Sequence, residues 1–202
     1  MIPGWGRGRR RRPRPPACAA DGFTLLDSLF TSTLLCILVV ISLPGMLTGV
    51  DRSRGAGAAR YVAARAALAK THAVGRSATV ALLFQQDARG VWFSMAQDGN
   101  GNGVRTQEVT QGIDHVIEAP VLLSDLFPGV SIGLSTQTQA MQAVQLGGTT
   151  LLSFTPLGTA TSGSVYVLGR DGTQWVVRVL GVTARARLLR YVPATGGWVN
   201  AD

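Results

Sequence analysis

The most regular pattern in the sequence is a long apolar run near the start of the chain. From Ser28 to Val50, 23 residues pass without an ionisable side chain other than Cys36. As an α-helix this run would reach about 34 Å, which is enough to cross the hydrocarbon core of a bilayer. The pattern therefore predicts a membrane helix, with Asp27 as the one charge close to its start.

The residues before the run predict its orientation. Residues 1–21 hold six arginines and a single acid, Asp21. Basic flanks tend to stay in the cytoplasm, so we expect the N-terminus there and the remainder of the chain on the other side of the membrane. An ordinary secretory signal would have a shorter apolar region followed by a small-residue cleavage site, and this sequence has neither feature.

The junction between the basic and apolar segments resembles the N-terminus of type IV prepilin-like proteins. It reads GFTLL at residues 22–26, followed by an acid and about 20 apolar residues. In that family a membrane aspartyl peptidase cuts after the glycine and methylates the new N-terminal phenylalanine. The resemblance implies cleavage between Gly22 and Phe23, N-methylation of Phe23, and a mature chain of residues 23–202. Asp27 stands where the family usually has glutamate.

Asp27 and Pro44 are the two candidate functional positions inside the helix. A carboxylate in a membrane helix is costly unless it is paired, so we expect Asp27 to pair with the Phe23 amine, its own or that of a neighbouring subunit, and to guide assembly. The alternative is a carboxylate at headgroup level, stabilised by the helix N-terminus. Pro44 predicts a kink, and the glycines that follow it predict a weak or partly unwound helix over residues 44–57.

Residues 58–76 return to strong helix-forming sequence dominated by alanine. Their periodicity predicts the amphipathic second half of one long helix, with its apolar side against a sheet and its basic side in solvent. The expected apolar positions are Tyr61, Val62, Leu68, Ala69 and Ala73, and the expected basic ones are Arg60, Lys70 and Arg76.

From residue 77 the pattern changes to short strands joined by turn residues. Asp171-Gly172 between two of them suits a type I′ hairpin turn. A long helix followed by strands in short-range meanders predicts an α+β protein with antiparallel sheets. The expected strands are residues 79–85, 91–97, 130–135, 151–155, 164–170, 173–180 and 182–192.

Several segments resemble the GspH/FimT group of pseudopilins. They are the end of the alanine-rich helix, the strand that holds Trp92, the glycine-rich loop from Asp98, and FTPLG at residues 154–158. The resemblance covers nearly the whole mature chain and implies a pilin-like fold and a minor subunit at or near the tip of a type II secretion pseudopilus or a type IV pilus. The expected organisation is a basic leader (1–22), a transmembrane and assembly helix (23–50), its amphipathic second half (51–77) and a periplasmic β-rich domain (78–202).

Charge and cysteine content limit other functions. The net charge of the 202-residue chain is +8, but the leader contributes +5, so the mature chain carries only +3. Bulk charge is therefore a weak argument for nucleic-acid binding. The two cysteines, Cys18 and Cys36, lie in the leader and the apolar run, so the expected periplasmic domain has no disulfide.

Two polar stretches carry candidate binding residues. Asp98, Asn100 and Asn102 alternate before Gly103 like the first ligands of a calcium loop, but the acid required at the twelfth position is replaced by Val109. The alternative is a glycine-rich connection in which these side chains stabilise turns. We therefore expect no metal site, with calcium as the exception to test.

The second stretch is the last expected strand, which carries Arg185, Arg187 and Arg190. Arg185 and Arg187 are two apart and share one face of a strand. DNA-uptake members of the resembled family bind DNA through a Gly-Arg-x-Arg motif here, and this chain has Ala184 in place of the glycine. These arginines are candidate contacts to DNA phosphates, and the alternative is a solvated face or a subunit contact.

No catalytic pattern accompanies these features. His72, in the expected helix, and His115, in an expected loop, lack metal-ligand or triad spacing, and no nucleophile elbow or P-loop occurs. We expect a structural protein with no enzymatic activity and no cofactor. Its expected partners are the prepilin peptidase, other major and minor pseudopilins, the inner membrane and secreted cargo, with nucleic acid as a less favoured partner.

Three functions remain open at this stage. The first is the minor pseudopilin, made as a single-pass inner-membrane precursor and moved into a filament after processing. The second is a DNA-binding minor pilin of an uptake pilus. The third is an unprocessed single-pass membrane protein with a periplasmic sensing domain.

Overall fold

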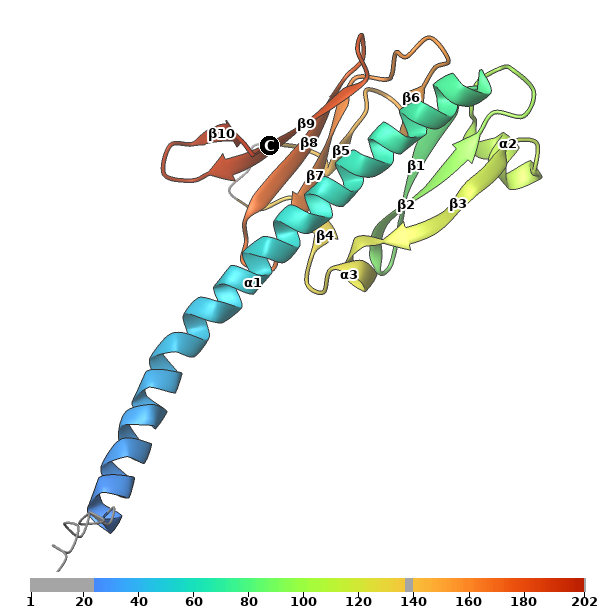
Figure 1. Ribbon diagram of the computed structural model, residues 1–202. Coiled ribbons are helices and arrows are strands. Elements are labelled where there is room, and N and C mark those ends of the chain that lie inside the picture. The colour runs from blue at the N-terminus through green and yellow to red at the C-terminus, as the bar shows by residue number, and fades with distance from the viewer. Residues whose placement is uncertain (1–23, 137–139, 202) are drawn as a thin grey trace, which may run out of the picture. The chain divides into compact units, whose positions relative to one another are not determined.

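The computed structural model describes residues 24–136 and 140–201. The chain divides into two compact units, Met1–Leu43 and Pro44–Asp202. The described residues form one long helix, two short helices and ten strands (Figure 1). The fold is α+β, as the sequence predicts, with an apolar N-terminal helix and a domain built from antiparallel sheets.

Helix α1 runs from Leu25 to Arg76 and belongs to both units. In the second unit one side of it is a stripe of small residues that are fully or almost fully buried. Their spacing of three and four residues keeps them on one face of the helix. The stripe consists of Ala58, Ala59, Val62, Ala66, Ala69 and Ala73.

The burial of these residues confirms most of the positions predicted for the apolar side of the helix. Val62, Ala69 and Ala73 are buried, while Tyr61 and Leu68 are half-buried and pack against the same core. Because alanine adds only a methyl group, the helix backbone lies close to the sheets.

Sheet A has four strands in the order β3-β2-β1-β6. A two-residue turn joins β1 to β2, because Asp87 pairs directly with Gly90. The last strand, β6, pairs with β1 although more than 60 residues separate them in sequence. The strands are β1 (Val80–Asp87), β2 (Gly90–Gln97), β3 (His115–Leu122) and β6 (Leu151–Phe154).

Sheet B has six strands, with the path β10-β9-β8-β7-β4 and β5 paired to β7. All of its pairs are antiparallel. The strands are β4 (Ser131–Ile132), β5 (Val144–Gln145), β7 (Gly163–Leu168), β8 (Gln174–Leu180), β9 (Arg185–Val192) and β10 (Gly197–Asn200).

The main core lies where α1 covers both sheets (Figure 1). Leu82 and Phe84 of β1 and Val165 and Val177 of sheet B join the helix stripe in a single cluster of buried side chains. A smaller cluster lies on the opposite face of sheet A, around Leu83, beneath the loop after β2 and helix α2 (Thr106–Gln111). Helix α3 (Leu123–Leu126) connects the two sheets.

The structure corrects four predictions of local structure. His115 begins strand β3 rather than lying in a loop. The strand expected over 130–135 is reduced to Ser131–Ile132. The β7–β8 connection has five residues between the paired Leu168 and Gln174, so it is not a two-residue type I′ turn. The sheets also include the long-range β1–β6 pair in addition to short-range meanders.

A fifth correction concerns residues 44–57, which the sequence predicts to be weak or partly unwound and which are helical throughout. Their glycines serve packing. A Cβ atom on Gly55 would lie 3.0 Å from the indole Nε1 of Trp175, and one on Gly57 would lie 3.2 Å from Phe127. The two glycines let large aromatic side chains contact the helix backbone.

Candidate functional site

Asp27 lies in the first turn of α1, where a carboxylate is favoured by the helix dipole. Thr24 caps this end, because its hydroxyl accepts a hydrogen bond from the Asp27 N–H at 3.3 Å. The Asp27 side chain is exposed, and its carboxylate forms no ion pair with another described residue. Gly22 and Phe23 lie outside the described residues, so cleavage between them and pairing of Asp27 with the Phe23 amine stay predictions.

Residues 25–43 present an almost wholly apolar surface that no described residue covers. Their hydroxyl groups do not interrupt this surface, since Thr31, Thr33 and Ser42 donate to carbonyl oxygens of the same helix. Such internal hydrogen bonding is what a helix in lipid requires. The exposed side chains are Leu25, Leu26, Leu29, Phe30, Leu34, Leu35, Ile37, Leu38, Val39, Val40, Ile41 and Leu43.

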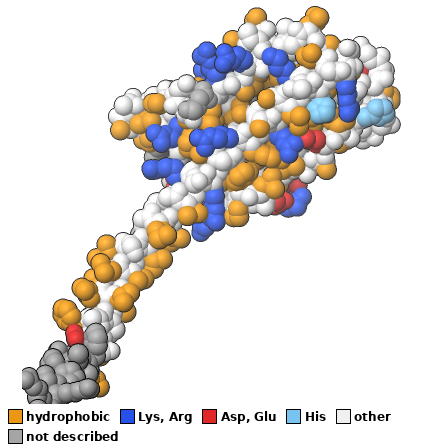
Figure 2. Space-filling model, in the orientation of Figure 1, with side chains coloured by type: hydrophobic (Ala, Val, Ile, Leu, Met, Phe, Trp, Pro, Cys, Tyr) orange, Lys and Arg blue, Asp and Glu red, His pale blue; other side chains and the backbone are white. Residues whose placement is uncertain are grey.

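Helix α1 is the one helix among residues 24–136 and 140–201 that is long and apolar enough to cross a membrane. Figure 2 shows the hydrophobic side chains along its N-terminal part. The helix continues through Pro44. The kink predicted at Pro44 falls at the border between the two units and stays a prediction.

The three candidate arginines of β9 do not share one surface. Arg185 and Arg187 are exposed and lie on the face of sheet B that is opposite to α1. Arg190 lies on the other face, where its guanidinium is 6.0 Å from the centre of the Trp175 ring. The predicted group is therefore reduced to two residues on the outer face.

A third arginine, Arg178, which is not among the residues predicted from the sequence, joins Arg185 and Arg187. Arg178 of β8 pairs directly with Arg187, and it is exposed. Its Nε donates a hydrogen bond to the hydroxyl of Ser164 on β7 at 3.5 Å. Arg178, Arg187, Ser164 and Gln145 line a surface hollow of about 430 Å³. The alternation of β8 marks Arg178 as outward-facing, but only the strand register shows which residue it meets.

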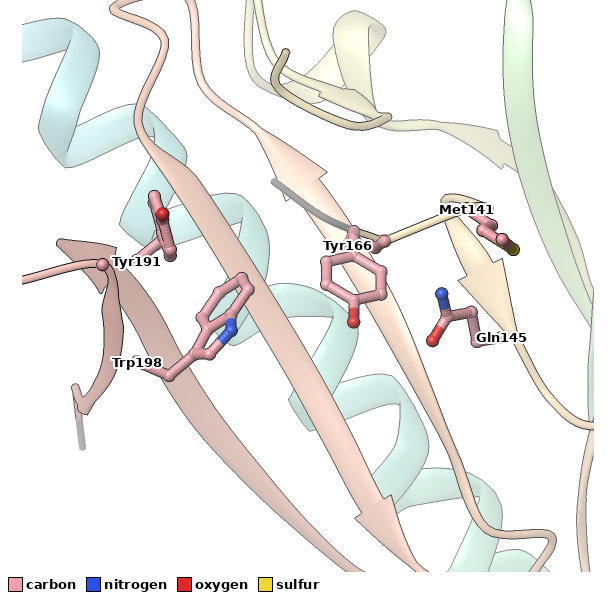
Figure 3. Close-up of a pocket in the computed structure, with 7 residues that line it drawn as sticks. Met141, Gln145, Tyr166, Tyr191 and Trp198 are labelled. Atoms are coloured by element: carbon pink, nitrogen blue, oxygen red, sulfur yellow. The ribbon is translucent and has the colours of Figure 1, made fainter. Parts of the chain in front are cut away.

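An aromatic groove of about 500 Å³ continues along the same outer face and shares Gln145 with the basic hollow. Figure 3 shows Tyr166, Tyr191 and Trp198 on one side of it and Met141 and Gln145 on the other. The Trp198 ring centre is 5.8 Å from that of Tyr166 and 5.3 Å from that of Tyr191. These tilted contacts hold β10 against the sheet and leave parts of the rings open to the groove.

The glycine-rich loop after β2 is stabilised by its own carboxylates. Oδ1 of Asp98 accepts N–H groups from Asn100 and Gly101, and Oδ2 accepts that of Gly103 at 2.7 Å. Asp114 is 1% exposed and accepts two further backbone N–H groups. These are the contacts expected of turn-stabilising residues.

The side-chain amides of this loop also form hydrogen bonds within it. Asn100 and Asn102 both donate to the carboxylate of Glu108 at 3.0 Å. No group of three or more metal-ligating His, Cys, Asp or Glu side chains occurs among the described residues. Calcium binding by Asp98, Asn100 and Asn102 stays the alternative to the expected absence of a metal site, and calcium-dependent melting of the protein would test it.

Hydrogen bonding also determines the charge state of Asp98. Burial of the side chain raises its pKa, but the backbone N–H groups, led by that of Gly103, outweigh burial and hold the pKa below its usual value. The carboxylate is therefore charged at neutral pH and stabilises the loop in that form.

Comparison with other proteins gives no direct indication of the function. No protein-family model matches the chain, and neither the curated proteins nor the solved structures contain a protein that is significantly similar to it.

Proposed function

We propose that this protein is a minor pseudopilin of the GspH/FimT type, a structural subunit at or near the tip of a secretion pseudopilus or a type IV pilus. The observation that carries the proposal is the uncovered apolar surface of residues 25–43, with Asp27 in the first turn of the helix. The sequence at Gly22-Phe23 supports the same reading, because it resembles a prepilin processing site.

The apolar surface of residues 25–43 needs a covering of lipid or protein. Twelve large apolar side chains exposed on one helix would be unstable in water. Lipid covers them while the protein resides in the membrane, and the helices of neighbouring subunits cover them in a filament. The Asp27 carboxylate then needs a cationic partner in either apolar environment, and the N-terminal amine of a processed subunit provides one.

The test is incorporation into filaments. We expect Asp27→Ala to be processed normally but to be depleted from isolated filaments, and Asp27→Glu to be incorporated like the wild type, because it keeps the charge. Immunoblots of sheared filament and membrane fractions would measure both variants. Normal incorporation of Asp27→Ala would contradict the assembly role of Asp27.

A DNA-binding minor pilin is the second candidate, favoured by the grouping of Arg178, Arg185 and Arg187 on one exposed face. Three guanidinium groups on adjacent strands can contact successive phosphates, and such binding weakens steeply with salt. In a filter-binding titration, R178Q/R187Q should weaken DNA binding by the full chain and lower its salt dependence, while R60Q should not. Absence of salt-dependent binding by the wild type would remove this candidate.

A further inference from the structure

The globular part of the protein begins to pack against α1 immediately after the apolar run ends. Arg52 lies two residues beyond Val50, and its Nε is 3.9 Å from the Asp171 carboxylate in the β7–β8 connection. One turn later Gly55 lies against Trp175 and the backbone of Gly169. If residues 28–50 cross the bilayer, the β7–β8 connection lies at the level of the lipid headgroups.

Two arginines meet at this level. A hollow of about 230 Å³ is lined by Arg52 and Arg190 together with Thr173, Tyr191, Val192 and Pro193. The arginines come from α1 and the end of β9, so the fold brings together residues that are far apart in sequence. No acidic side chain lines the hollow.

The donor groups of these arginines are largely unused. The Arg52 side chain is 64% exposed, and its one ion pair among the described residues is the long contact to Asp171. Arg190 lies over the Trp175 ring, and no hydrogen bond to another described side chain accompanies this contact. Planar guanidinium groups that flank a hollow of this kind suit a tetrahedral oxyanion, which can accept two hydrogen bonds from each.

The neighbouring charged side chains reduce the positive charge of this site but do not neutralise it. Asp171 is the nearest acid, and its carboxylate accepts hydrogen bonds from the hydroxyl and N–H of Thr173. Arg54 is paired with Asp51 at 3.3 Å. Arg170 is exposed in the same β7–β8 connection and adds a further positive charge.

We propose that Arg52 and Arg190 form a binding site for the phosphate of an anionic phospholipid in the leaflet that faces the globular domain. The position of the hollow favours a lipid phosphate over a soluble one, because Arg52, which lines the hollow, lies within one helical turn of the end of the apolar run. Bound lipid holds this edge of the domain against the membrane. The proposal rests on α1 crossing a membrane and does not depend on processing or filament assembly.

The test compares lipids that differ in charge. The full chain in neutral detergent micelles is titrated with dioctanoylphosphatidylglycerol and, separately, with dioctanoylphosphatidylcholine. Each basic side chain near a membrane surface contributes about fivefold in affinity, so R52Q/R190Q should weaken phosphatidylglycerol binding by about 25-fold. The matched control R76Q/R105Q removes the same charge at two exposed positions elsewhere on the domain and should change the affinity by less than about twofold.

Three outcomes would overturn the proposal: equal binding of the two lipids, an equal loss in both double variants, or inorganic phosphate that competes as well as the lipid at equal concentration. The last result would indicate a site for soluble phosphate instead. The single variant R52Q keeps the Arg190–Trp175 contact and should still lose about fivefold, which separates loss of binding from loss of folding. Normal processing and filament assembly combined with any of these failures would leave the proposed function intact.

Discussion

Residues 25–43 and residues 58–73 belong to the same helix, yet their side chains have opposite surroundings. The first segment exposes leucine, isoleucine, valine and phenylalanine, and the second buries mainly alanine. Large branched side chains maximise contact with lipid or with other helices, whereas small ones let a helix backbone approach a sheet. The difference shows that side-chain size, as much as hydrophobicity, distinguishes the exposed segment of the helix from the segment packed against the sheets.

The largest expected effect comes from placing a charge in the first segment. Val39→Arg should make membrane insertion less favourable by about 2.5–3.5 kcal/mol, because Val39 lies near the middle of the apolar run. Alkaline extraction of membranes would measure the loss of integrated protein. Ala64→Arg, at an exposed position of the second segment, is the control and should leave insertion unchanged. Equal extraction of both variants would contradict the assignment of the first segment to lipid.

The second segment should respond to size instead of charge. Ala69→Leu adds volume at a fully buried position between α1 and the sheets, and it should cost about 1–3 kcal/mol of unfolding free energy. Ala67→Leu makes the same change two residues away at an exposed position and should cost little. Chemical denaturation of the full chain in detergent would compare them, and equal stability of the two variants would mean that the stripe is not tightly packed.

The two units also differ in how they use a carboxylate. Asp98 is buried and accepts three backbone N–H groups, whereas Asp27 is exposed. Asp98→Asn should destabilise the domain by about 1–2 kcal/mol at neutral pH, and Asp27→Asn should not. Thermal melting of both variants beside the wild type is the measurement.

The stabilisation by Asp98 should decrease as the pH is lowered. The pKa of Asp98 is lowered in the folded protein, so its stabilisation is complete above the unfolded value of about 4 and is lost as the pH falls through the folded value. The difference between wild type and Asp98→Asn should therefore shrink below about pH 4. A difference that stays constant at acid pH would show that the charge is unimportant.

The smallest expected effect concerns the ion pair between Arg65 of α1 and Glu118 of β3. Both side chains are partly exposed, so Glu118→Gln should cost only about 0.2–1 kcal/mol. Changing Glu118 preserves the position of Arg65, whose guanidinium lies 4.7 Å from the Tyr61 ring centre. Denaturation at low and high salt should show the difference narrowing at high salt, and a salt-independent cost would indicate lost packing instead.

Local patterns in the sequence predicted the elements that depend on neighbouring residues. The β1–β2 and β7–β8 hairpins, the helix stripe and the shared face of Arg185 and Arg187 follow from periodicity over a few residues. The same alternation places Arg190 on the other face of the strand. The register that adds Arg178 to this group depends on strand pairing, which the sequence alone does not specify.

Strand β3 was missed for a physical reason. It contains Glu118 and Pro120, which are unfavourable in a central strand. The structure places it at the edge of sheet A, with register shifts opposite Phe93 and Met95 that accommodate the proline. Gly55 and Gly57 predict a weak helix when only their sequence neighbours are considered. The aromatic side chains that pack against them come from distant parts of the chain, so the sequence does not reveal this packing.

The mass of the N-terminal peptide of the mature protein tests the central claim most directly. Membrane fractions would be prepared from cells with and without the prepilin peptidase and analysed by mass spectrometry. The pseudopilin proposal predicts a peptide that begins with N-methylated Phe23 in the presence of the peptidase only. An intact N-terminus or cleavage at another position would contradict it and leave a membrane-anchored α+β protein that does not enter a filament.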